Sequence, residues 1–97
     1  VLATPGIRAV FLFRDALGLS MKGRAVRTLD LRAGVVFSWI GIDRVSGASL
    51  AGAKWPLLNA TLHHEGRQSL SNAALGGVVS FSQRSGKSLI IIPFGKV

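Results

Sequence analysis

The sequence predicts an all-β domain, an antiparallel β-sandwich or barrel-like fold of about seven short strands. Apolar and polar residues alternate along 24–31, 57–64 and 78–83, the period of a half-buried strand. The segment 34–42 is rich in β-branched and aromatic residues, which favour strands. Turn residues separate these segments at 32–34, 45–47, 64–66 and 75–77.

The expected strands, in chain order, are 9–13, 24–31, 34–42, 48–55, 57–64, 78–83 and 88–92. In 48–55 the pattern is weaker because Gly52 interrupts it, and such a glycine often marks a bulge or a close backbone approach. The residues RSGK at 84–87 predict a hairpin between the last two strands. The segment 14–23 has a helix-like composition, but its two glycines favour a loop or a single turn.

The 97 residues correspond to one domain, and 48% hydrophobic residues are enough for a core. The longest apolar runs, 9–13 and 88–94, are much shorter than the roughly 20 residues that cross a bilayer, so we expect no membrane partner.

The first residues, VLATPG, lack a signal-peptide pattern, and without an initiator Met we expect a fragment or an excised domain. The absence of cysteine excludes disulfides and thiolate sites and is consistent with a cytoplasmic protein.

Basic residues dominate the charge, with 12 Lys and Arg against 4 Asp and Glu and a net charge of +8. This balance favours anionic partners such as nucleic acid, phosphorylated ligands or an acidic protein surface. The alternative is a solvated basic surface on a domain separated from a more acidic neighbour. The densest basic cluster is Arg24, Arg27 and Arg32, but no RNP-like motif accompanies it, so nucleic acid is the less favoured partner.

Residues that could carry catalysis are scarce. The four carboxylates are scattered, so neither an acid–base pair nor a hard metal site is supported. His63 and His64 are adjacent, and in a strand their rings point to opposite faces, which makes a poor chelate. The chain has no nucleophile elbow and no glycine-rich phosphate loop. We therefore expect neither catalytic residues nor metal ligands in this chain.

Two polar stretches remain, KWP at 54–56 and SLSN at 69–72. The Ser and Asn side chains of SLSN could bond their own backbone in a loop, or could offer neutral donors and acceptors to a small polar ring. The Trp of KWP could belong to the core or to the wall of a ligand site.

The segments GAKWPL (52–57) and SLSN (69–72), in this order and spacing, resemble the C-terminal, thiamine-binding domain of the thiamine pyrophosphokinase family. The strands at 78–92 follow as they do in that family, and Gly34 and Ser38 match one of its upstream strands. The similarity covers about residues 29–94. Two departures are the strongly basic segment before this region and Ala53, where the family usually has Leu.

The resemblance implies that 1–97 is a single β-sandwich domain that follows an α/β nucleotide-binding domain, absent here. The whole enzyme transfers pyrophosphate from ATP to thiamine with Mg²⁺, and its catalytic motifs lie in the absent domain. This chain alone is therefore expected to be inactive and to bind no cofactor itself. The family also implies a homodimer with thiamine at the interface with a catalytic domain.

By position in the motifs, Ser69 and Asn72 would face the thiamine pyrimidine from a loop, with Ser71 supporting them, and Asn72→Ala would weaken thiamine binding without unfolding the domain. Trp55 would either present its face to the cationic thiazolium ring or belong to the dimer or sandwich core. Lys54 would serve a phosphate or a partner Asp. The alternatives are a stand-alone basic β module that binds nucleic acid or another polyanion, and a structural dimerisation domain.

Overall fold

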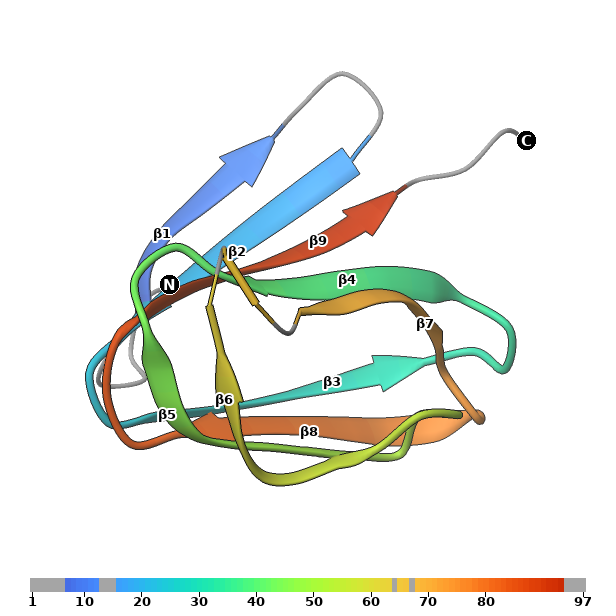
Figure 1. Cartoon of the computed structure of the whole chain (residues 1–97). Coiled ribbons are helices and arrows are strands. Elements are labelled where there is room, and N and C mark those ends of the chain that lie inside the picture. The colour runs from blue at the N-terminus through green and yellow to red at the C-terminus, as the bar shows by residue number, and fades with distance from the viewer. Residues whose placement is uncertain (1–6, 13–15, 64, 67, 94–97) are drawn as a thin grey trace.

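The computed structural model describes residues 7–12, 16–63, 65–66 and 68–93, which form two antiparallel sheets packed face to face (Figure 1). The strands are β1 (Ile7–Leu12), β2 (Ala16–Lys22), β3 (Ala25–Leu31), β4 (Val36–Gly41), β5 (Val45–Ala51), β6 (Leu57–Leu62), β7 (Ser69–Ala73), β8 (Gly77–Gln83) and β9 (Lys87–Pro93). The expected all-β, antiparallel sandwich is thus confirmed, with nine described strands instead of about seven. This part of the chain contains no helix long and apolar enough to span a membrane.

The two sheets have the strand orders β1-β2-β9-β4-β7 and β3-β8-β5-β6. Only β1–β2 and β5–β6 are neighbours both in sequence and in a sheet, so most turns carry the chain from one sheet to the other. The edge strands β7 and β6 lie on the same side of the sandwich (Figure 1). An isolated bridge between Ala53 and Ala74 joins the two sheets there.

The core consists of inward-facing side chains from both sheets. Phe81 on β8 is fully buried and contacts Phe37 and Trp39 of β4 edge-on, with ring centroids 5.4 and 5.3 Å apart. Edge-to-face packing of this kind contributes about 0.5–1.5 kcal/mol per pair beyond area burial. The three rings therefore fix the two sheets against each other at their centre.

The expected hairpin at 84–87 is wrong, because β8 pairs with β3 and β5 whereas β9 pairs with β2 and β4. The turn itself is present, but it crosses between the sheets. The Gln83 side-chain amide donates hydrogen bonds to the carbonyl oxygens of Gly23 and Gly86 at 2.8 and 2.9 Å, and its oxygen accepts one from Ser88 Oγ at 2.6 Å. These hydrogen bonds stabilise the connection between the two sheets. The residue types in the turn do not reveal them.

The expected loop or turn at 14–23 is also wrong for its described part, which is strand β2 between β1 and β9. All seven residues of β2 pair with β9, and Leu19 and Met21 are buried in the core. Neighbours on both sides thus override the low strand propensity of Gly18. Residues 13–15 lie outside the described residues.

Strand β6 deviates from the alternation expected for 57–64. Ala60 and Leu62 point inward, but Leu58 is 88% exposed. The intervening Asn59 has a φ of 50°, and the register between β5 and β6 shifts nearby, so one residue is out of phase. The Asn59 N–H donates to Ser49 Oγ at 3.1 Å, which stabilises the irregular backbone.

Gly52 makes the close backbone approach that the sequence indicates. Its φ is 86°, and a Cβ at this position would collide with the carbonyl oxygen of Val78. We expect Gly52→Ala to lower the free energy of unfolding by the left-handed strain of about 1–2 kcal/mol and by a further overpacking cost of about 1–3 kcal/mol. Urea unfolding, followed by tryptophan fluorescence, measures the total loss in the free energy of unfolding.

The matched control is Gly23→Ala, since Gly23 has a φ of 72° but no atom within 4 Å of the position that a Cβ would occupy. This variant should carry the strain alone. Equal losses in the two variants would show that the approach of Gly52 to Val78 is not a tight constraint.

Candidate ligand-binding pocket

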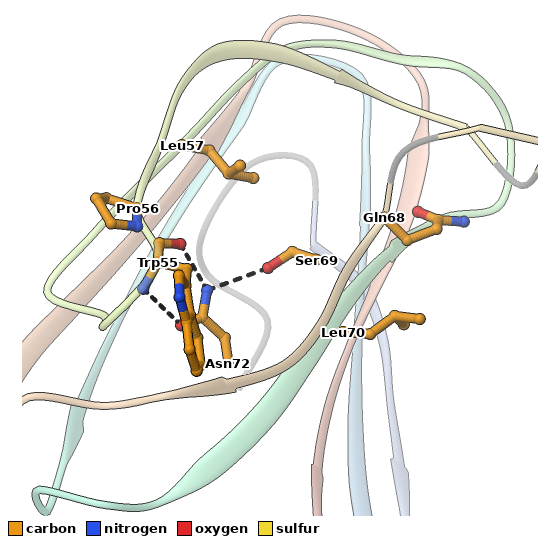
Figure 2. A pocket seen from close by; sticks show the side chains of 7 residues that line it. All are labelled: Trp55, Pro56, Leu57, Gln68, Ser69, Leu70 and Asn72. Atoms are coloured by element: carbon orange, nitrogen blue, oxygen red, sulfur yellow. Dashed lines mark hydrogen bonds between the residues drawn. The ribbon is translucent and has the colours of Figure 1, made fainter.

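A pocket of about 300 Å³ opens between the two edge strands, on the side of the sandwich that the bridge of Ala53 to Ala74 joins (Figure 2). One wall is the segment 55–57 at the start of β6, and the other consists of residues 68–70 and Asn72 from the β7 region. The two polar stretches singled out in the sequence therefore meet across one pocket. Trp55, Ser69 and Asn72 line it, whereas Ser71 does not.

The SLSN segment is a bulged strand, not the expected loop. Phe37 pairs with Asn72 and Trp39 with Ser69, so Ser38 of β4 faces two residues of β7. Ser71 has a φ of 51°, and its N–H donates to Ser38 Oγ at 3.0 Å. Side chains three positions apart in a regular strand point to opposite faces, but the extra residue of a bulge restores the phase. Ser69 and Asn72 consequently both point inward, with 7% and 1% exposure.

Asn72 uses the full hydrogen-bonding capacity of its amide within the chain. Its oxygen accepts from the backbone N–H groups of Trp55 and Ala73 at 3.0 and 2.9 Å. Its nitrogen donates to the Trp55 carbonyl oxygen at 2.7 Å and to Ser69 Oγ at 3.2 Å (Figure 2). An amide has two acceptor sites and two donors, so none remains for a ligand. Asn72 therefore positions Trp55 and Ser69.

Trp55 is 55% exposed at the mouth of the pocket, so the sandwich-core interpretation of this residue is wrong. The fully buried tryptophan is Trp39. The Lys54 ammonium lies 4.9 Å from the centroid of the Trp55 ring, within the distance of a cation–π contact. The backbone of Lys54 donates to the Ala73 carbonyl oxygen at 2.8 Å and so attaches the segment to β7.

Ser69 is a polar side chain of the pocket with hydrogen-bonding capacity left for a ligand. In the described part of the chain its hydroxyl accepts one side-chain hydrogen bond, from Asn72 Nδ2. The hydroxyl proton and one further lone pair are then available at the pocket wall. The site thus offers the neutral Ser69 hydroxyl as donor and acceptor beside one aromatic face.

Gln68 is a pocket residue that the sequence interpretation missed. Its side-chain oxygen accepts a hydrogen bond from the Gly41 N–H at 2.7 Å, and its side-chain nitrogen donates one to the Gly41 carbonyl oxygen at 3.2 Å. At the end of β4, the Gln68 side chain thus bonds the backbone of Gly41 as a neighbouring strand would. Its position next to SLSN was the only signal for it. Pro56, the last residue of KWP, and Leu57 after it also line the pocket, although the sequence assigned a role to neither.

The histidines and carboxylates do not form a metal-binding group among the described residues. His63 Nδ1 accepts from the Glu65 N–H at 3.3 Å within its own turn, and His64 lies outside the described residues. No three His, Cys, Asp or Glu side chains of the described chain gather in a way that could hold a metal ion.

Comparison with known families places both motif segments in a single match. The model of the family described as "Thiamin pyrophosphokinase, vitamin B1 binding domain" matches residues 27–87. The chain belongs to this vitamin B1 binding domain family. The match extends from β3 to the start of β9 and includes both walls of the pocket.

Three solved structures share the fold of this B1-binding domain. They are thiamine pyrophosphokinase from Bacillus subtilis (16% identity, TM-score 0.78), thiamin pyrophosphokinase from Geobacillus thermodenitrificans (21%, 0.76) and a thiamin pyrophosphokinase family protein from Enterococcus faecalis (14%, 0.76). The alignments cover 90%, 87% and 95% of this chain but 41%, 40% and 43% of those chains. The chain therefore spans about two fifths of each. A search of curated proteins found no match.

The saturated amide makes a stability effect of Asn72→Ala the expected result, in addition to any effect on binding. The variant leaves the buried polar groups of Trp55 and Ser69 without partners, and each such group costs about 1–3 kcal/mol. Thermal unfolding should show a clear fall in Tm. Ser69→Ala, which removes only one hydroxyl, is the control and should lower Tm much less; an unchanged Tm for Asn72→Ala would contradict the positioning role.

Proposed function

We propose that this chain is the thiamine-binding domain of a thiamine pyrophosphokinase, which transfers pyrophosphate from ATP to thiamine. The observation that carries the proposal is the family match, together with the convergence of its two motif segments on one pocket. The pocket of about 300 Å³ is at the small end of the range for ligand sites. It suits one heterocycle inside the pocket and a second over Trp55 at its mouth, while the rest of the ligand extends toward a second domain.

The two functional groups of the pocket correspond to the two rings of thiamine. The Ser69 hydroxyl can donate to and accept from the aminopyrimidine, which carries neutral donors and acceptors. The Trp55 face, which already holds the Lys54 ammonium, can take the cationic thiazolium ring by displacing that ammonium. Asn72 holds both groups in place and does not itself touch the ligand.

The role of this chain in the reaction is to bind and orient thiamine. ATP and Mg²⁺ belong to the α/β nucleotide-binding domain that accompanies this domain in the proposed enzyme, and that domain supplies the catalytic residues. A homodimer would cover the exposed Leu58, Leu70 and Trp55 around the pocket. A cysteine-free chain that works with ATP is consistent with a cytoplasmic enzyme.

A titration of the ¹⁵N-labelled chain with thiamine tests the proposal. We expect the largest amide shifts at Ser69–Asn72 and a shift of the Trp55 indole N–H. Ser69→Ala should weaken binding about two- to tenfold, since a hydrogen bond to a ligand is worth about 0.5–1.5 kcal/mol net.

The matched control is Ser82→Ala, which removes a half-buried hydroxyl from β8 in the other sheet. It should leave the thiamine affinity unchanged. Equal affinities for wild type and Ser69→Ala, or shifts that avoid β7 and Trp55, would refute the assignment of this pocket.

A further inference from the structure

Three turns that cross between the sheets gather at one end of the sandwich, on the left in Figure 1. They are the β2–β3, β4–β5 and β8–β9 turns. Backbone hydrogen bonds join them: Gly23 N–H to the Gly86 carbonyl oxygen at 2.9 Å, and Ile42 N–H to the Lys87 carbonyl oxygen at 2.8 Å. Residues distant in sequence thus form one continuous surface.

This end of the molecule is strongly basic. The three turns carry five cationic side chains and one carboxylate, that of Asp43, and all six residues are exposed. The cationic residues are Lys22, Arg24, Arg44, Arg84 and Lys87. The Arg84 guanidinium donates to Asn59 Oδ1 at 3.2 Å, a neutral acceptor, so this bond leaves its charge unbalanced. The surface therefore attracts anions.

Lys22 and Lys87 face each other directly across the β2–β9 pair. Directly opposed side chains lie on the same face with Cβ atoms about 4.5–5.5 Å apart, and like charges in this position are destabilising. The Lys87 carbonyl oxygen accepts the N–H groups of both Ile42 and Asp43, so its backbone is held firmly. The fold thus places two positively charged side chains next to each other. Their mutual repulsion costs free energy, and a bound anion would offset it.

Both lysines line a second pocket of about 190 Å³, with Ser20, Met21, Ile42 and Ser88. This volume is roughly that of six water molecules in the liquid. It shares no lining residue with the pocket at Trp55. The pocket therefore combines a small volume with two cationic lining residues.

We propose that the pocket between Lys22 and Lys87 binds a small phosphate-class anion, of the size of a diphosphate group. Two ammonium groups supply six N–H donors, and phosphate oxygens accept hydrogen bonds from such donors strongly. Arg24 and Arg44 on the adjoining turns add long-range attraction. The site goes beyond the proposed thiamine pocket and does not depend on it.

A small anion suits this surface better than a nucleic-acid strand. Binding of single strands needs exposed aromatic side chains among the cations, on which bases stack. Among the side chains whose burial the structure describes, which begin at residue 16, the exposed aromatic one is Trp55, which belongs to the other pocket. The diphosphate can be free or part of a nucleotide, and the two sources are separated by comparing inorganic pyrophosphate with ADP.

The experiment is an NMR titration of the whole chain with inorganic pyrophosphate, and in a second arm with ADP, at constant ionic strength. We expect shifts at residues 20–22, Ile42 and 87–88 and none at Ser69–Asn72. Lys22→Gln and Lys87→Gln should each raise the Kd for pyrophosphate about tenfold. ADP binding no tighter than pyrophosphate would assign the site to the diphosphate group; tighter ADP binding, with the same lysine dependence, would assign it to a nucleotide diphosphate.

The matched control is Arg32→Gln, which removes one exposed positive charge at the opposite end of β3. The Kd of Arg32→Gln for pyrophosphate should differ from that of the wild type by less than about twofold, because a distant exposed charge is screened. Equal effects of Arg32→Gln and Lys87→Gln would show a general charge effect and overturn the site. Binding of a short DNA duplex without any pyrophosphate response would overturn it in favour of an extended polyanion surface.

The Tm with and without pyrophosphate gives a second readout, which distinguishes loss of the anion site from misfolding of a variant. Because Lys22 and Lys87 repel each other, Lys22→Gln should leave the ligand-free Tm equal or higher while it reduces the rise in Tm caused by pyrophosphate. A lower ligand-free Tm would contradict the repulsion on which the proposal rests. Thiamine shifts at β7 and pyrophosphate shifts at β2 and β9 are separate signals, so either proposal can fail alone.

Discussion

Two hydrogen bonds between the Asn72 amide and the Trp55 backbone extend the closure of the sandwich between β6 and β7. Asn72 belongs to the edge strand of one sheet, and Trp55 lies on the connection between β5 and β6 of the other. Among the described residues, no regular ladder joins these two edges apart from the single bridge of Ala53 to Ala74. By binding the N–H and carbonyl groups of Trp55 together, Asn72 continues that bridge by one further pair. The pocket exists because this closure holds its two walls at a fixed separation.

The bulge at Ser71 is the local condition for that closure. In a regular strand, one of Ser69 and Asn72 would face the core and the other would face solvent. The left-handed residue costs on the order of 1–3 kcal/mol, and the hydrogen bond from its N–H to Ser38 Oγ offsets part of that cost. Both inward polar side chains then bond each other at 3.2 Å. The spacing of the SxSN motif is therefore the spacing of a bulge.

Local sequence pattern predicted the sandwich, and the family resemblance predicted Trp55, Ser69 and Asn72 of the candidate site, but not their roles. The alternation along β8 is confirmed by the burial of Val79 and Phe81. Strand β2 could not be identified in this way, because its extended conformation is stabilised by pairing with β9 along its full length. Nor could the sequence show that backbone groups 17 positions away saturate the Asn72 amide. Gln68 escaped notice because its partner, Gly41, is 27 positions distant. Long-range bonding, and not residue type, separates a contact residue from a positioning residue here.

The net charge of +8 places opposite demands on the two pockets. At the proposed thiamine site a thiamine cation is repelled at long range, so we propose that its affinity comes from contacts made after desolvation: the Ser69 hydroxyl, the Trp55 face and the apolar wall beside them. A phosphate-class anion is attracted at long range and needs little shape complementarity. Thiamine binding should therefore depend weakly on salt and anion binding strongly, since screening acts on the long-range term. The two pockets approach each other at β4, where Gly41 is bonded by Gln68 of the first and is paired with Ser88 of the second. A cationic ring and an anionic group can thus be held on one short stretch of strand without sharing a side chain.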